Sequence, residues 1–130
     1  MRLKIFRSVF KLHPLKESFS YAIKGIVYLF FFHRNMRIIF LLGLAAFFLG
    51  IILKLTVFEF MVLCLTVSIV FLAEMFNTAI ELIIDMFTDK YHSLLKIIKD
   101  ISAGVVLIAS INALIIGYFI FLRKILNLLR

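Results

Sequence analysis

The sequence is poor in cysteine, proline, glycine and acidic residues. Its 130 residues include one cysteine, one proline, five glycines and seven acidic residues, against fifteen lysines and arginines. A single cysteine, Cys64, provides neither a disulfide framework nor a thiolate metal site within the chain. No segment has the glycine pattern of a P-loop or of a protein-kinase phosphate loop. Nucleotide sites of those two kinds are therefore excluded.

Apolar residues, in contrast, are abundant. They make up 65% of the chain, and the mean hydropathy is +1.16. A soluble domain of this size leaves a large share of its surface in water and cannot hide so much apolar area. The formal net charge of +8 does not indicate nucleic-acid binding, because the basic residues flank apolar stretches, where such residues anchor to anionic lipid. We therefore expect an integral membrane protein without a nucleic-acid partner.

Three stretches are predicted to span the membrane as helices, at about 38–53, 55–85 and 101–122. A helix needs roughly 20 apolar residues to cross the hydrocarbon, with some tolerance for shorter spans. Residues 1–32 mix basic and apolar positions around Pro14, a pattern typical of an amphipathic helix lying in the membrane interface. The sequence thus predicts an all-α fold in a single domain, residues 1–130.

Basic residues also indicate the orientation. Eight lysines and arginines precede the first span and three lie between the second and third, whereas only Lys54 separates the first two spans. The positive-inside rule then places the N-terminus and residues 86–100 in the cytoplasm. Arg123, Lys124 and Arg130 fall on the opposite side, against the rule. Residues 1–13 carry charges throughout, so no cleavable signal peptide is expected.

The segment EMFNTAIELIID, residues 74–85, places polar groups at the end of the second span. At about 100° per residue, Glu74, Glu81 and Asp85 lie within about 40° of one another on a helix. Polar groups in hydrocarbon are costly, and ionisable ones usually serve a function. Asn77 and Thr78 flank this line and are, by themselves, equally compatible with hydrogen bonds between helices.

Three aligned carboxylates repel one another unless a proton, a basic group or a metal ion neutralises them. Lys99 and Asp100, at the start of the third span, could complete the cluster. Oxygen ligands without a matching histidine or cysteine set favour Mg²⁺ over zinc. A carboxylate at this depth could also act as general base toward a lipid hydroxyl. The residues alone predict a metal-assisted or proton-coupled site at the cytoplasmic face.

The segment AEMFNTAIELIIDMFTDKYHSLLKIIKDISAGVVLI closely resembles the signature of the small bacterial membrane lipid kinases, the prokaryotic diacylglycerol kinase and undecaprenol kinase family. That signature reads E-x-x-N-[ST]-A-I-E-x-x-x-D, then Y-H-x-L, then K-D and small residues. YAIKG (21–25) and RNMR (34–37) also resemble the family. The resemblance covers nearly the whole chain.

The resemblance implies a homotrimer in the bacterial inner membrane, with composite sites between subunits that transfer phosphate from ATP, with Mg²⁺, to a lipid alcohol. In that case Glu74 is the general base, Asn77 positions the reacting groups and Glu81 holds Mg²⁺. Ala103 would let the lipid or a neighbouring helix approach closely. The residues expected at the nucleotide are Tyr21, Asp85, Tyr91, His92, Lys99 and Asp100.

His33 departs from the family pattern, because the best-studied members carry a metal-binding glutamate there. Histidine is a poor ligand for Mg²⁺, so His33 is either a weak metal or phosphate ligand or a plain interfacial residue. The short N-terminus and residues 33–37 slightly favour undecaprenol over diacylglycerol as substrate. A non-enzymatic trimer, a channel or scaffold, stays open: it would depend on polar groups at mid-membrane, such as Asn112.

Overall fold

The computed structural model describes residues 15–87 and 93–129, and within them the chain forms four helices. These are α2 (Leu15–Phe32), α3 (Arg34–Ile52), α4 (Val57–Phe87) and α5 (Ser93–Leu128). The chain divides into two compact units, one ending at His33 and the other beginning at Arg34, and each is described by itself.

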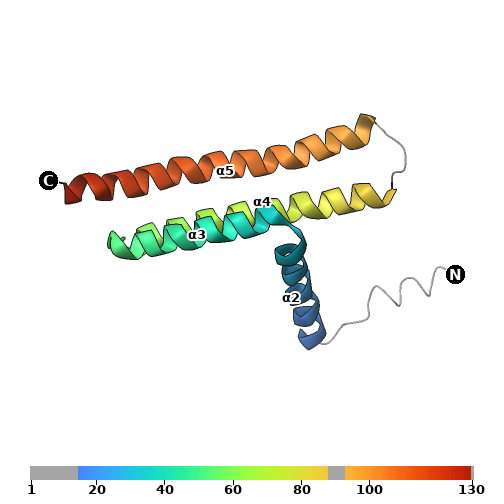
Figure 1. Ribbon diagram of the computed structural model, residues 1–130, viewed down its shortest axis with the longest axis horizontal. Helices are drawn as coiled ribbons and strands as arrows, with labels where there is room; N and C mark the ends of the chain where they lie inside the picture. Colours follow the sequence, from blue (N-terminus) through green and yellow to red (C-terminus); the bar gives the residue numbers. More distant parts are fainter. Residues whose placement is uncertain (1–14, 88–92, 130) are drawn as a thin grey trace. The chain divides into compact units, whose positions relative to one another are not determined.

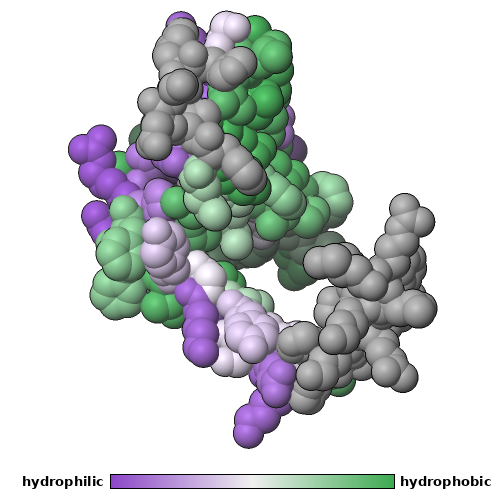
Figure 2. All heavy atoms as spheres, turned by 90° about the vertical axis from the view of Figure 1, so that its right-hand side faces the viewer, coloured by the Kyte–Doolittle hydropathy of each residue, from purple (hydrophilic) through white to green (hydrophobic). Residues whose placement is uncertain are grey.

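The second unit is a bundle of three helices that are each long and apolar enough to cross a membrane. The apolar segments are Arg34–Ile52, Val57–Met86 and Ser93–Leu128. Successive helices run in opposite directions, and α4 packs against both α3 and α5 (Figure 1). Figure 2 shows apolar residues covering much of the bundle on the side that faces the viewer. The predicted all-α fold with three apolar spans is therefore confirmed.

The helices extend beyond the predicted apolar stretches. The third span was predicted to begin at about residue 101, but α5 already begins at Ser93. The segment 93–100 is polar enough to stand in the interface, and its backbone continues the helical hydrogen bonds of the apolar part. Lys99 and Asp100 are consequently on a helix rather than in a loop, which fixes the direction of their side chains relative to α4.

Small residues bring α4 and α5 together. Val70, Ala73 and Ala109 form a buried cluster, and Val106 and Ala113 pack against it. Without a hydrophobic driving force between helices in lipid, close approach through small side chains is a main source of helix association. The polar residues of α4 and α5 are therefore held at a short, fixed separation.

A tight turn joins α3 to α4. Lys54 has a left-handed backbone conformation with φ 53°, and the Leu55 and Lys54 amides donate to the carbonyls of Gly50 and Ile51 at 3.0 and 3.1 Å. This pair of bonds is the Schellman arrangement at the end of a helix. Thr56 and Glu59 then form a capping box at the start of α4: the Thr56 amide donates to Glu59 Oε2 at 2.7 Å, and the Glu59 amide donates to Thr56 Oγ1 at 3.3 Å.

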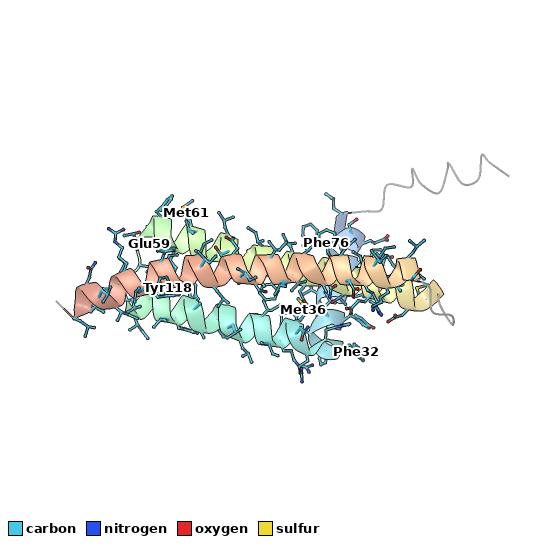
Figure 3. The ribbon with its side chains drawn as sticks, turned by 90° about the horizontal axis from the view of Figure 1, so that it is seen from above. Phe32, Met36, Glu59, Met61, Phe76 and Tyr118 are labelled. Carbon is cyan, nitrogen blue, oxygen red and sulfur yellow. The ribbon has the colours of Figure 1, made fainter. Side chains whose placement is uncertain are left out.

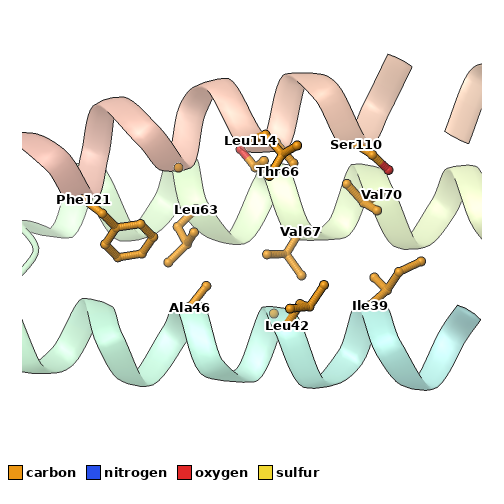
Figure 4. A pocket seen from close by; sticks show the side chains of 13 residues that line it. Ile39, Leu42, Ala46, Leu63, Thr66, Val67, Val70, Ser110, Leu114 and Phe121 are labelled. Carbon is orange, nitrogen blue, oxygen red and sulfur yellow. The ribbon is translucent and has the colours of Figure 1, made fainter. Parts of the chain in front are cut away.

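A mainly apolar groove of about 400 Å³ lies over α4, between α3 and α5. Its walls include Leu42 and Ala46 from α3, Leu63 and Val67 from α4, and Phe121 from α5 (Figure 4). The groove exists because α3 and α5 each pack mainly on α4.

The first unit contains α2, which begins at Leu15, directly after Pro14, within the predicted interfacial segment. The Lys24 ammonium lies 5.9 Å from the centre of the Tyr21 ring, a cation–π geometry. The amide of His33 donates to the Leu29 carbonyl at 2.9 Å, so the helical pattern extends to the end of this unit. The expected helix before Pro14 lies outside the described residues.

The contact between α3 and α4 can be tested at Gly43. A Cβ atom there would meet Val67 Cγ1 at 2.8 Å, and valine is stiff at χ1 in a helix. Overpacking costs about 1–3 kcal/mol, more than the ~1 kcal/mol that alanine adds as a helix former. Gly43→Ala is expected to lower the thermal midpoint of the protein in detergent micelles. In Gly117→Ala, the matched control, the new Cβ meets only Phe121 at 4.0 Å, so the midpoint should stay level or rise. A Gly43→Ala midpoint equal to the control would contradict this packing.

Candidate functional site

The predicted polar stripe of α4 lies on the part of the helix that contacts α5. Glu74, Asn77 and Thr78 are buried, Glu81 is half-buried and Asp85 is exposed. Burial thus decreases along the stripe toward the end of α4. The stripe leads from the packed part of the bundle out to the polar end of the helix.

A chain of hydrogen bonds joins the two helices at this stripe. The Ser102 hydroxyl donates to Asn77 Oδ1 at 2.7 Å, and Asn77 Nδ2 donates to Glu81 Oε1 at 3.3 Å. Ser102 Oγ also lies 2.9 Å from the Lys99 carbonyl oxygen. A hydroxyl has one proton, so the two acceptors compete, and the Asn77 oxygen is the nearer. This bond turns the Asn77 amide so that its NH₂ group faces Glu81.

Glu74 lies one turn before this chain and is only 4% exposed. No described residue donates a hydrogen bond to its carboxylate. Every fully buried side-chain nitrogen or oxygen in the described part of the chain has a partner. The Glu74 oxygens therefore keep some accessible surface. A buried carboxylate with reachable oxygens can accept a proton from a group that enters the site.

Lys99 neutralises the outer end of the stripe. Its Nζ lies 2.8 Å from Asp85 Oδ1, and the side chains of Lys99 and Asp85 are 40% and 63% exposed. Glu81 also attracts the Lys99 ammonium. Asp100, although next in sequence, is exposed and forms no ion pair or hydrogen bond with another described residue. Thus Lys99 joins the carboxylate cluster as predicted, whereas Asp100 is left available to a ligand.

The three carboxylates share one side of α4, but they do not converge on one point. Eleven residues separate Glu74 from Asp85, which is roughly 16 Å along a helix axis. Within the described part of the chain, no three acidic, histidine or cysteine side chains could hold one metal ion. The described part of one chain therefore offers an ion at most two carboxylates here. That number matches Mg²⁺, which is usually bound by one or two carboxylates together with water and substrate phosphates.

The other predicted site residues are dispersed. Ala103 is exposed, and a Cβ added to Gly104 would meet nothing within 4 Å, so this side of α5 is open to an approaching group. Tyr21 and His33 belong to the first unit, which is described by itself. The His33 ring lies 6.0 Å from that of Tyr28. Tyr91 and His92 lie outside the described residues.

Ser102 was not identified from the sequence. It is buried and bonds to Asn77 from the neighbouring helix. A helical wheel that continues from Lys99 places Ser102 one turn further along the same side of α5, because residues three apart are neighbours. This three-residue spacing would have identified Ser102, but only once the helix was known to begin before Lys99.

Ser102→Ala is expected to lower the free energy of unfolding by about 1 kcal/mol, because it removes the donor to the buried Asn77 oxygen. Ser110→Ala is the matched control: it lies on the same helix, and its hydroxyl has no hydrogen bond to another described residue. Thermal unfolding in micelles measures both. Equal losses in the two variants would show that the bond to Asn77 does not join the helices.

Comparison with known proteins gives a consistent result. The family described as prokaryotic diacylglycerol kinase matches residues 20–121, most of the chain. A diacylglycerol kinase of Synechocystis sp. is 40% identical over 116 residues, covering 88% of this chain and 66% of the longer relative. An undecaprenol kinase of Bacillus subtilis is 35% identical over 114 residues, covering 88% of this chain and 93% of the relative. The matched range contains the whole polar stripe of α4 and the residues of α5 that bond to it. The chain therefore belongs to the prokaryotic diacylglycerol kinase family of membrane lipid kinases.

Proposed function

We propose that the protein transfers the γ-phosphoryl group of ATP to the hydroxyl of a membrane lipid alcohol, with Mg²⁺ bound at Glu81. The observation that carries this proposal is the buried carboxylate of Glu74 beside the hydrogen-bonded Asn77 and Glu81, inside a helix that is apolar enough to cross a membrane. A lipid hydroxyl and a water-soluble nucleotide can meet only near the interface, and the stripe runs from buried to exposed positions.

Glu74 takes the proton of the lipid hydroxyl as the lipid oxygen attacks the γ-phosphorus. The bond from that phosphorus to the bridging oxygen breaks, and ADP leaves with the electron pair. Phosphoryl transfer depends mainly on positioning and on stabilising charge. Asn77 fixes the orientation of Glu81 through its NH₂ group, and Ser102 fixes the orientation of Asn77. Lys99 and Asp100 supply a cation and a carboxylate to the nucleotide.

The donor set fits Mg²⁺. Glu81 offers a half-buried carboxylate with one oxygen held by Asn77, which leaves further lone pairs for an ion. Bound there, Mg²⁺ would neutralise the charge of the ATP phosphates and of the carboxylates. His33 is the weak point of this set, because a hard cation prefers oxygen donors. Water or a phosphate oxygen would fill the position that a glutamate holds in the best-studied relatives.

Further elements of the proposal come from the resemblance. We place the protein in the bacterial inner membrane as a homotrimer, with the N-terminus and the end of α4 in the cytoplasm. Subunits would then combine to complete each site, with Tyr21, Tyr91 and His92 near the nucleotide. Composite sites agree with the described part of one chain, in which no three acidic, histidine or cysteine side chains meet at one point.

Undecaprenol is the substrate that we favour, and diacylglycerol is the alternative. The relative named undecaprenol kinase matches this chain over 93% of its own length, whereas the one named diacylglycerol kinase is considerably longer than the matched part.

The test is transfer of radiolabelled phosphate from Mg·ATP in mixed micelles, with undecaprenol and diacylglycerol offered separately. Product is expected with undecaprenol. Glu74→Gln removes the base and keeps the shape, so the rate should fall by a factor on the order of 10²–10⁴. Glu59→Gln is the control, because it changes a carboxylate on the same helix and glutamine preserves the capping box. Its rate should stay within about twofold of the parent.

Each outcome of this assay has a meaning. Product with diacylglycerol alone would assign the other substrate and leave the chemistry intact. If Glu74→Gln transfers phosphate at the rate of the parent protein, Glu74 is not the general base. No product with either lipid, from a folded protein at high Mg²⁺, would favour the non-enzymatic alternative. Asn112, on which a channel would depend, is exposed on α5 in the structure.

A further inference from the structure

Besides the apolar groove, the bundle has a more polar pocket, which lies at the end opposite to the carboxylates. It has a volume of about 500 Å³ and lies between the start of α4 and the last turns of α5. Figure 3 shows Glu59 and Tyr118 toward this end of the bundle, and Phe76 and Met36 toward the other. Fifteen residues of α4 separate Glu59 from Glu74, which is about 22 Å along the helix. The pocket is therefore separate from the candidate active site.

The charges inside the pocket do not cancel. Lys124 Nζ lies 3.0 Å from Glu59 Oε2 and donates to the Lys54 carbonyl at 3.2 Å. Glu59 Oε2 also accepts from the amide and the hydroxyl of Thr56, and Lys124 balances the charge of this carboxylate. Arg123, which lines the same pocket, is exposed and has no acidic partner among the residues described. The pocket consequently presents one guanidinium whose charge the described chain does not neutralise.

The donors in the pocket suit a phosphate group. A guanidinium offers paired N–H donors that match two phosphate oxygens, and it is only weakly hydrated. Asn127 adds an amide to the same lining, and Lys124, on the same helix, is paired with Glu59. The capping box and the bond to the Lys54 carbonyl hold Lys124 in place, so the cationic wall is preorganised rather than a loose surface lysine.

The apolar part of the lining points to a lipid rather than to a free phosphate. Phe58 and Phe119 line the pocket and are 73% and 67% exposed, and Ile120 lies beside them. These residues begin and end membrane-spanning helices, where the acyl chains of a lipid pass the protein. Basic pockets between transmembrane helices bind anionic lipid head groups on the cytoplasmic side, and the donors of this pocket suit the same head-group phosphate. An inorganic phosphate would gain nothing from the aromatic wall.

We propose that this pocket binds the phosphate-bearing head group of an anionic membrane lipid, with Arg123 on the phosphate and the acyl chains along Phe58 and Phe119. The proposal also accounts for Arg123 and Lys124, which break the positive-inside pattern. Binding of a lipid head group explains why basic residues lie on the side of the membrane opposite to the cytoplasm. It does not depend on the proposed kinase activity.

The test is native mass spectrometry of the full-length protein, released from micelles after titration with phosphatidylglycerol, with phosphatidylcholine as the zwitterionic comparison. The parent should retain phosphatidylglycerol preferentially. Arg123→Gln should weaken that retention about tenfold, which corresponds to one strong charge-assisted contact. Arg123→Lys keeps the charge but loses the paired donors, so an intermediate loss is expected.

Lys54→Asn is the matched control. It removes one positive charge at the same end of the bundle, outside the pocket lining, and asparagine tolerates the left-handed backbone at that position. The retention of phosphatidylglycerol by Lys54→Asn should stay within about twofold of that by the parent protein. Equal losses in Lys54→Asn and Arg123→Gln would reduce the effect to general surface charge and overturn the site. The folded charge-state distribution of each variant, in the same spectra, checks that it has not unfolded.

Two further results would overturn the proposal. If inorganic phosphate at the same concentration displaces phosphatidylglycerol, the pocket is a site for a free anion. If Arg123→Gln changes the number of subunits while lipid retention stays at the parent level, the pocket is a contact between copies of the chain. Preferential retention of the anionic lipid that depends on Arg123 and is insensitive to inorganic phosphate would establish the site.

Discussion

The hydrogen bond from Ser102 to Asn77 joins α4 to α5 at the depth where Glu74 is buried. A polar group in a membrane-spanning helix must find a partner, because hydrocarbon offers none. Here the partner comes from the neighbouring helix at 2.7 Å, and the amide that it fixes donates onward to Glu81. The same bond therefore satisfies Asn77, holds the two helices in register and directs the carboxylate that we assign to the metal. Small residues such as Ala73 and Ala109 make this short separation possible.

The bundle is polar at both ends, and the two ends are built differently. At the end of α4, carboxylates exceed the basic groups that pair with them, which suits a cation and a nucleotide that carries one. At the start of α4, Glu59 belongs to the capping box and also forms an ion pair with Lys124. The positive charge of Arg123 is therefore left without an acidic partner among the described residues. The apolar helices between these ends fix their separation. One chain thus separates the metal site and the lipid pocket that we propose.

The sequence was sufficient for the membrane spans and for the polar stripe, because both depend on local pattern. Long apolar runs determine the spans, and a helical period of 3.6 residues places Glu74, Glu81 and Asp85 on one side. The same calculation ignores the rise along the axis, so it suggested a cluster where the carboxylates are spread out. It also missed Ser102 and the start of α5 at Ser93, since these follow from packing between helices.

Binding of a metal–nucleotide complex at Glu81 tests the central claim most directly. Mn²⁺ can replace Mg²⁺ and is visible by electron paramagnetic resonance, so free and bound ion can be measured with a non-hydrolysable ATP analogue present. We expect that the parent protein binds the complex and that Glu81→Gln weakens binding by about tenfold or more, whereas Glu59→Gln binds as the parent does. Equal binding by the parent and Glu81→Gln would contradict the assignment of the end of α4 as the metal–nucleotide site.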